Sequence, residues 1–210
     1  MKVTVIGAGN MGSAFVKQLH CAGHAIRVTS RDDAKAAALA AQYPGVVAVP
    51  AAGAAAEADI VVLATGYADA VNALRSVGPL TGKVVVDITN PLTPDYMGLT
   101  LGHSTSAAEE IATAVPEAVL VKAFNTLFAQ VLAEGADFGS GRKASVFVAG
   151  DSEPARQAVA ALAESMGFAV VDAGGLKNAR YLEPLAGLNI YLGYGAGLGT
   201  GIAPTWIRKA

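Results

Sequence analysis

The chain opens with Lys2-Val3-Thr4-Val5-Ile6-Gly7-Ala8-Gly9-Asn10-Met11-Gly12, a short β-branched run that leads directly into the pattern G-x-G-x-x-G. In such a pattern Gly7 permits a tight turn, Gly9 lets the backbone approach a phosphate, and Gly12 lets the next helix pack on the strand. The N-terminus of that helix presents free N–H groups and partial positive charge to an anion. The stretch therefore predicts a strand, a turn and a helix that together hold a dinucleotide pyrophosphate.

The glycine pattern gains its weight from its surroundings, because glycine makes up 24 of the 210 residues and isolated matches are common. Behind it, Ala14, Phe15, Leu19 and Ala22 recur at helical spacing. The pattern thus lies between a strand and a helix, as a dinucleotide fold requires. The alternative is a glycine-rich turn of an α/β domain that binds no nucleotide.

The composition favours a globular domain that acts on a small molecule. Hydrophobic residues make up 53% of the chain and charged residues 15%, which suits a large core and argues against disorder. The net charge is −2, from 15 basic and 17 acidic residues, so no general basic field exists to attract nucleic acid or a membrane surface. We therefore expect a small-molecule substrate, no nucleic acid and no membrane.

Two further features bear on where the protein works. The single cysteine, Cys21, can form no internal disulfide, and we expect it to be a small core residue in a reducing compartment. No signal-peptide pattern is visible, so the sequence predicts a cytoplasmic protein. Residues 185–202 carry no formal charge, but the glycines, Asn189 and Thr200 among them favour a buried helix and a glycine-rich loop over a membrane span.

Short apolar runs alternate with helical patterns along the chain. The strand-like runs are residues 2–6, 25–29, 45–49, 59–64, 83–88, 118–122, 144–149 and 169–171. The helical patterns are residues 10–22, 32–43, 51–57, 68–77, 104–114, 127–134, 153–166 and 178–194. This alternation indicates βαβ units, whose right-handed crossovers build a doubly wound parallel sheet. The sequence therefore predicts an α/β fold, a parallel Rossmann sheet with additional C-terminal strands and a C-terminal helix.

We expect these elements to form a single Rossmann-type dinucleotide-binding domain over residues 1–210. Its nucleotide-binding half extends to about residue 88, and residues 89–210 complete the sheet and add the C-terminal helix. A length of 210 residues fits one large domain, and no repeat, linker or charge block divides it.

The residues after the second strand-like run favour NADP over NAD. In NAD enzymes an acidic side chain at this strand end accepts a hydrogen bond from the ribose 2′-OH, but Ser30 holds that position and Asp32 lies beyond it. Arg31 can pair with a 2′-phosphate, Lys35 lies one helical turn further on, and Ser30 can donate its hydroxyl. The alternative is a solvated helix start, in which Arg31 and Lys35 only offset Asp32 and Asp33.

Small and polar residues follow three strand-like runs, where an open α/β sheet binds its ligands. These candidates are Ala64, Thr65, Thr89, Asn90, Pro91, Asn125 and Thr126. The side chains of Asn90 and Asn125 could hydrogen-bond a nicotinamide carboxamide, a ribose or the substrate, although each residue type is also common in turns.

Residues for acid–base chemistry are scarce. His103 is the one histidine that could reach the cleft, and a loop position at the surface is its ordinary role. Lys122 ends a strand-like run and could donate a proton, although a lysine at such a position is usually solvated. No metal motif and no nucleophile motif occurs, so we expect no metal. Direct hydride transfer between two rings needs mainly alignment of donor and acceptor, and it fits this inventory.

Five blocks of sequence together resemble the coenzyme F420-dependent NADP oxidoreductases. The blocks are Gly9-Asn10-Met11-Gly12, Ser30-Arg31 with Lys35, Asn90-Pro91-Leu92, Lys122-Ala123-Phe124-Asn125-Thr126, and Asp172-Ala173-Gly174 with Asn178-Ala179-Arg180 and Glu183. The resemblance extends along essentially the whole chain. It implies hydride transfer between NADPH C4 and C5 of F420, with the two rings stacked.

The same resemblance implies positions for the cofactor and the acceptor. Residues 8–11 would hold the pyrophosphate, and Ser30, Arg31 and Lys35 the 2′-phosphate. Leu127, Gly201 and Ile202 would cover the nicotinamide and deazaflavin side, with Asn125 on the substrate. Asn90, Asn125 and Leu127 are then the candidates for aligning the rings.

Other acceptors and roles remain open. A flavin, a small carbonyl or an imine could replace F420, because the opening glycine block also resembles imine and pyrroline-carboxylate reductases. A non-catalytic NADP(H) sensor is a further alternative. The apolar last helix and tail suggest a homodimer.

Overall fold

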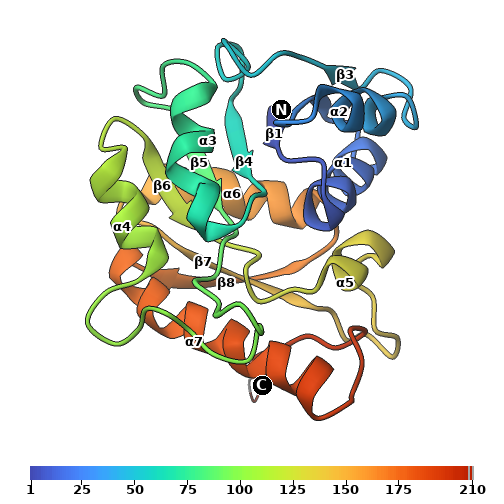
Figure 1. Ribbon diagram of the computed structural model, residues 1–210. Helices are drawn as coiled ribbons and strands as arrows, with labels where there is room; N and C mark the ends of the chain where they lie inside the picture. The colour runs from blue at the N-terminus through green and yellow to red at the C-terminus, as the bar shows by residue number, and fades with distance from the viewer. Residues whose placement is uncertain (208, 210) are drawn as a thin grey trace.

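All eight strands in the described part of the chain belong to one sheet. This computed structural model describes residues 1–207 and 209. The strands are β1 (Lys2–Ile6), β2 (Ala25–Thr29), β3 (Val47–Ala48), β4 (Ile60–Leu63), β5 (Val84–Asp87), β6 (Val119–Lys122), β7 (Ser145–Ala149) and β8 (Ala169–Gly174). Their order is β3-β2-β1-β4-β5-β6-β7-β8 (Figure 1).

Six of these strands form the predicted doubly wound sheet. β1 to β6 run parallel to their neighbours, whereas β7 is antiparallel to β6 and β8 is parallel to β7. The order of the six is that of a dinucleotide-binding sheet. The predicted α/β Rossmann sheet with additional C-terminal strands is therefore confirmed, and the reversed direction of its last two strands is new.

Helices cover both faces of the sheet. They are α1 (Asn10–Cys21), α2 (Asp33–Ala40), α3 (Ala70–Ser76), α4 (Ala107–Ala114), α5 (Ala129–Glu134), α6 (Glu153–Ser165) and α7 (Ala179–Ile190). Short 3-10 turns precede α3 (Tyr67–Asp69) and α7 (Leu176–Asn178), and a π turn (Tyr191–Gly195) follows α7.

Alternation along the strands divides the core between the two faces. One face of the sheet packs with α1, α2 and α6 through Val3, Val5, Ile60 and Val62. The other face packs with α3 and α4 through Val61 and Leu63. Successive side chains of a strand point to opposite faces, so a continuous apolar run is what a sheet covered on both sides requires. This burial fixes the register of the parallel strands and thereby the position of their carboxyl ends.

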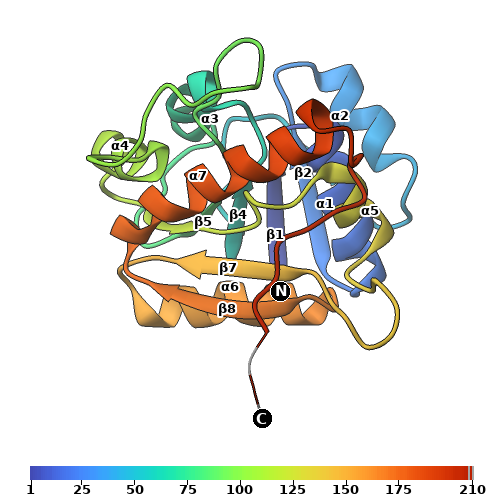
Figure 2. The same cartoon turned by 90° about the horizontal axis from the view of Figure 1, so that it is seen from below.

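Helix α7 packs against β7 and β8, and its first residue, Ala179, contacts the cluster that holds α4. Leu182 packs with Phe147 and Ala149 of β7, and Leu185 joins this third cluster. Figures 1 and 2 show α7 running from the side of α4 towards α5, so that it passes the carboxyl ends of the parallel strands. The antiparallel pair β7–β8 thus serves as the platform that brings α7 to the ligand-binding edge.

Three expectations from the sequence are wrong in detail. Residues 51–57 form turns instead of a helix, because Gly53 has a left-handed φ of 82° and interrupts the helical hydrogen bonding. Cys21 is exposed, since it lies at the end of α1 and on its outer side. The C-terminal helix ends at Ile190, and residues up to Gly195 continue it as a π turn.

Within residues 1–207 and 209, no helix combines the length and the apolar character needed to cross a lipid bilayer. The apolar stretch at 185–202 divides instead into the end of α7, the π turn and an extended tail.

Close backbone contact joins β1, α1 and the end of β4. Gly7 has a φ of 117°, and a Cβ there would overlap the carbonyl oxygen of Ala64. A Cβ on Gly12 would overlap the carbonyl oxygen of Gly7, whereas one on Gly9 would meet no atom within 4 Å. Two of the three glycines are therefore required by packing, and the third lies beneath open space.

This difference predicts losses of stability of different size for two alanine substitutions. Gly12→Ala should lower the free energy of unfolding by about 3 kcal/mol, because the new methyl group collides with backbone. Gly9→Ala should cost less than about 1 kcal/mol, the effect of alanine at a helix N-cap. Urea unfolding of both variants measures the difference, and equal destabilisation would contradict the assignment.

Candidate functional site

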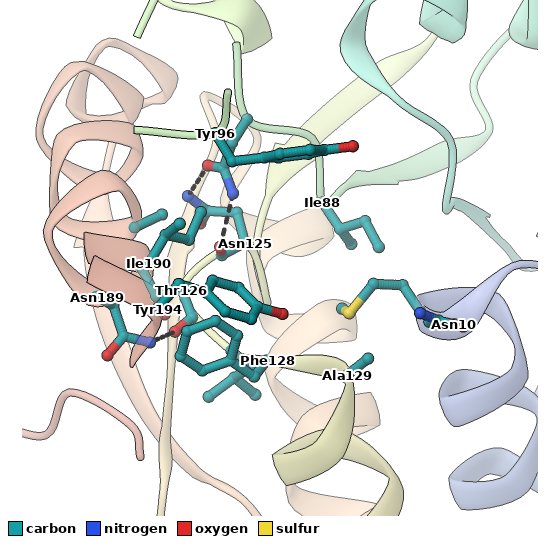
Figure 3. Close-up of a pocket in the computed structure, with 14 residues that line it drawn as sticks. Asn10, Ile88, Tyr96, Asn125, Thr126, Phe128, Ala129, Asn189, Ile190 and Tyr194 are labelled. Atoms are coloured by element: carbon teal, nitrogen blue, oxygen red, sulfur yellow. Dashed lines mark hydrogen bonds between the residues drawn. The ribbon is translucent and has the colours of Figure 1, made fainter. Parts of the chain in front are cut away.

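A cavity of about 240 Å³ lies at the carboxyl ends of β1, β5 and β6, with α7 as its far wall (Figure 3). Its lining residues are Asn10, Met11, Ile88, Asn90, Tyr96, Asn125, Thr126, Leu127, Phe128, Ala129, Ala186, Asn189, Ile190 and Tyr194. A second cavity of about 430 Å³ shares Asn10, Phe128, Ala129 and Tyr194 with it. The two cavities adjoin at the start of α1, directly after the glycine turn.

Two asparagine side chains form the polar floor of the cavity. Asn90 Nδ2 donates to the main-chain oxygen of Asn125 at 2.9 Å, and Asn125 Nδ2 donates to Asn90 Oδ1 at 3.0 Å. Asn125 Nδ2 also donates to the main-chain oxygen of Leu182 in α7 at 3.0 Å. The predicted candidates Asn90 and Asn125 are therefore brought together, and they join β5, β6 and α7.

A buried ion triad lies beneath this amide pair. Lys122 Nζ is 2.7 Å from Asp87 Oδ2 and 2.9 Å from Glu183 Oε1, and the three side chains are no more than 1% exposed. The expectation of a solvated Lys122 is therefore wrong, because two carboxylates take the place of water around the ammonium group. A buried lysine with two ionic partners is a structural cation, and it does not line the cavity.

Backbone groups complete the triad. Glu183 accepts hydrogen bonds from the N–H groups of Ala107 at 2.9 Å and Ala108 at 3.1 Å, which are the first residues of α4. Lys122 Nζ donates to the main-chain oxygen of Thr89 at 2.7 Å. The triad thus satisfies the free N–H groups of a helix start and a buried carbonyl, and it links β5, β6, α4 and α7.

Charged groups on the outer side of α4 reinforce the same junction. Arg180 binds Glu109 through Nε at 2.8 Å and Nη2 at 2.6 Å, and this hydrogen bonding holds the pKa of Glu109 below its usual value. Burial, followed by the hydrogen bond to Glu110, raises the pKa of Tyr67 to about 12. These groups brace the helices, and none of them lines the cavity.

The residues predicted to bind a 2′-phosphate lie at the carboxyl end of β2 and the start of α2. Asp32 caps α2, with its Oδ1 accepting from the N–H of Lys35 at 3.2 Å, so this carboxylate is already engaged by the helix. The side chains of Arg31 and Lys35 are 85% and 73% exposed. Arg31 Nη1 is 3.1 Å from Asp69 Oδ1, and it therefore lies above the sheet edge between β2 and β4.

The remaining predicted residues differ in how close they lie to the cavity. Ala64 and Thr65 follow β4 beside the glycine turn, and Leu127 lines the cavity. Gly201 and Ile202 do not line it, and Ile202 packs on the edge of the main core. His103 is exposed in a turn.

Sequence reasoning missed Asp87 and Glu183 as partners of Lys122, and Tyr96, Asn189 and Tyr194 as cavity residues. A signal for the triad exists: Asp87 ends the run Val84-Val85-Val86, and Lys122 ends Val119-Leu120-Val121. A single charge at the end of an apolar run of a central strand indicates a buried ion that needs a partner. No comparable signal marks the tyrosines, which reach the cavity only through the path of the chain.

Known proteins resemble this chain over most of its length. A family model described as NADP oxidoreductase coenzyme F420-dependent matches residues 2–91. The F420-dependent NADP reductase of Methanothermobacter thermautotrophicus is 31% identical, over 91% of this chain and 89% of its own length. A solved structure from Arthrobacter sp. FB24, provisionally named an F420-dependent NADP-reductase, has a TM-score of 0.88 at 32% identity, covering 99% of this chain and 100% of that one.

Metalloreductases and imine reductases also resemble this chain. Metalloreductase STEAP3 of Rattus norvegicus is 30% identical over 88% of this chain, and the chain spans 36% of that protein's length. An imine reductase structure from Pseudomonas sp. has a TM-score of 0.66 at 22% identity, covering 93% of this chain and 63% of that one, and shows a shared fold alone.

The triad predicts that Lys122 stabilises the fold. Lys122→Met should lower the free energy of unfolding by about 3–5 kcal/mol, because it leaves two carboxylates buried without their cation. Lys2→Met is the matched control: the Lys2 side chain is 62% exposed and lies 3.9 Å from Glu57. Its loss should change stability by no more than about 0.5 kcal/mol. Chemical denaturation that finds the two variants equally stable would contradict the role of the triad.

Proposed function

This chain belongs to the family of coenzyme F420-dependent NADP oxidoreductases, and on that premise we propose that it transfers a hydride between NADP(H) and a ring acceptor such as F420 or a flavin. The resemblance inferred from the residues is confirmed by a relative that matches nearly the full length of both chains. When bound, NADPH supplies the hydride and the deazaflavin or flavin ring accepts it.

The observation that carries the proposal is the character of the cavity wall. Among the described residues that line it, none is Asp, Glu, His, Lys or Arg, and the ionisable side chains are Tyr96 and Tyr194. Hydride transfer between two rings needs alignment and exclusion of water. The negative charge that arrives with the hydride is delocalised over the reduced acceptor ring, which can take its proton from solvent, so the wall needs no general acid. An apolar wall of Met11, Ile88 and Leu127 with a polar amide floor supports this chemistry.

The nucleotide would lie along the carboxyl ends of β2, β1 and β4. We assign the pyrophosphate to Gly7, Ala8, Gly9, Asn10, Met11 and Gly12, where the open space above Gly9 supports close approach of the backbone. Ser30, Arg31 and Lys35 would bind the 2′-phosphate, since Asp32 is engaged as a helix cap. Ala64, Thr65, Asn90, Pro91 and Leu127 would line the path to the nicotinamide.

The acceptor would enter the part of the cavity that faces α7. Asn125 and Leu127 would contact it there. The exposed rings of Tyr96 and Tyr194, which are 62% and 63% exposed, lie at the rim where a planar ring can stack.

The assembly and location belong to the same proposal. Tyr181, Leu188 and Tyr191 of α7 and its following turn are 74%, 55% and 52% exposed, which supports a homodimer through this face. A dimeric mass in solution, lost in Leu188→Glu, would establish it.

The exposed free thiol of Cys21 supports a reducing compartment, and we place the enzyme in the cytoplasm as one domain over residues 1–210.

An acceptor screen tests the function directly. We expect loss of NADPH absorbance on adding F420, FMN or FAD, and no comparable rate with cyclic imines or small carbonyls. Turnover of imines alone would assign the chain to the imine-reductase alternative, which the shared fold leaves open. Tight NADPH binding without turnover of any acceptor would instead identify a nucleotide sensor.

The 2′-phosphate assignment makes a separate prediction. Arg31→Ala should weaken NADPH binding by about 1–3 kcal/mol, the contribution of a charge-assisted hydrogen bond, and should leave NADH binding unchanged. Arg142→Ala is the matched control, because Arg142 is exposed in the loop before β7, away from the cleft. Calorimetric titration measures both nucleotides, and equal losses for NADPH and NADH would exclude the assignment.

A further inference from the structure

We infer that Asn125 and Thr126 recognise an amide edge, an N–H group beside a C=O group, on the ring that enters the cavity. Asn125 Oδ1 accepts the hydrogen bond from the N–H, and the hydroxyl of Thr126 faces the adjacent carbonyl. The inference rests on the proposed function and specifies the ring chemistry that the same site requires.

The orientation of the Asn125 amide follows from its partners. Asn125 Nδ2 donates to the main-chain oxygen of Leu182 at 3.0 Å, and a carbonyl oxygen can only accept, so the NH₂ group must face α7. The second N–H of this group donates to Asn90 Oδ1 at 3.0 Å. Asn90 is oriented in turn, because its Nδ2 donates to the main-chain oxygen of Asn125 at 2.9 Å. Both donors of the Asn125 amide are thus used, and its oxygen is a fixed acceptor.

That oxygen is buried and lacks a hydrogen bond from any described residue. Asn125 is 5% exposed and Thr126 is 2% exposed, and neither Asn125 Oδ1 nor Thr126 Oγ1 has a partner within the described part of the protein. Both residues line the cavity, where Figure 3 labels them beside Ile190 and Tyr194. Buried polar atoms are nearly always hydrogen-bonded, so these two are suited to a ligand.

The ion triad lies next to the amide pair along the chain. Asp87 and Lys122 each precede a member of the amide pair by three residues, and Glu183 directly follows Leu182. The triad therefore holds the three backbone segments on which Asn90, Asn125 and the Leu182 carbonyl lie. The acceptor is preorganised by contacts that are themselves buried.

Two rings of the proposed reaction carry the required edge. The carboxamide of nicotinamide has an N–H group beside its C=O, and a deazaflavin or flavin has a ring N–H between two carbonyls. A simple cyclic imine has neither. The chemistry that both rings share is an N–H donor next to an oxygen acceptor. Analogues of each ring that lack only the N–H show whether the site binds the nicotinamide or the acceptor ring.

The experiment uses the wild-type protein with two matched ligand pairs. The first pair is NADPH and its acetylpyridine analogue, in which a methyl group replaces the carboxamide NH₂, compared by direct binding. The second pair is a deazaflavin and its N3-methyl derivative, compared by kcat/KM. We expect a loss of about 10- to 100-fold in one pair, because the analogue leaves the Asn125 oxygen unpaired. Loss in the first pair assigns the edge to nicotinamide, and loss in the second assigns it to the acceptor.

Variants then test whether Asn125 is the residue that discriminates. In the pair that shows the loss, Asn125→Leu should lower the ratio of parent ligand to analogue to about onefold. Asn189→Leu, which replaces a second asparagine of the cavity, should retain the wild-type ratio. The inference would be overturned if the wild-type protein did not discriminate between parent ligand and analogue in either pair. It would also be overturned if Asn125→Leu discriminated as strongly as the wild-type protein. A protein that binds no NADPH at all would instead refute the proposed function itself.

Discussion

A single ammonium group between two carboxylates holds the ligand-binding edge of this protein together. Lys122 lies 2.7 Å from Asp87 and 2.9 Å from Glu183, and water reaches none of the three side chains to a significant extent. Because each buried ion costs several kcal/mol of lost hydration, the arrangement is stable only when all three meet in good geometry. The strands β5 and β6 and the helix α7 are thereby fixed relative to one another, and the cavity is built from residues immediately adjacent to them.

The two ends of the cleft are made in different ways. At the glycine turn the backbone itself forms the site. Gly7 and Gly12 let β1, α1 and the end of β4 come into contact, and the N-terminus of α1 stays open to an anion. Between β5, β6 and α7, oriented side-chain amides and an apolar wall line the cavity. This division explains why a short glycine pattern predicts the cofactor class, whereas the acceptor depends on contacts between β5, β6 and α7.

The sequence predicts features that depend on local signals, and it does not predict features that depend on contacts between distant elements. Strands β1 and β2 were predicted to the residue, because apolar runs and turn glycines are local signals. The direction of β7 carries no such signal, since alternation of strands and helices does not report which way a strand runs. Lys122 was expected to be solvated because its partner Glu183 lies far along the chain, in a helix whose position depends on β7 and β8. Asn90 and Asn125 were found because they follow parallel strands, whereas Asn189 was missed because it reaches the cavity from α7.

Stability alone does not explain why charged residues occupy this junction, since apolar residues often replace buried ion pairs without loss. Here the surrounding backbone supplies the reason. Glu183 takes the first two N–H groups of α4, and Lys122 takes the carbonyl of Thr89. Apolar side chains of the same shape would leave these three backbone groups buried without partners, each at the cost of a lost hydrogen bond. The charges are therefore required by the way β5, α4 and α7 meet, and the fixed orientation of the Asn125 amide is a consequence of that requirement.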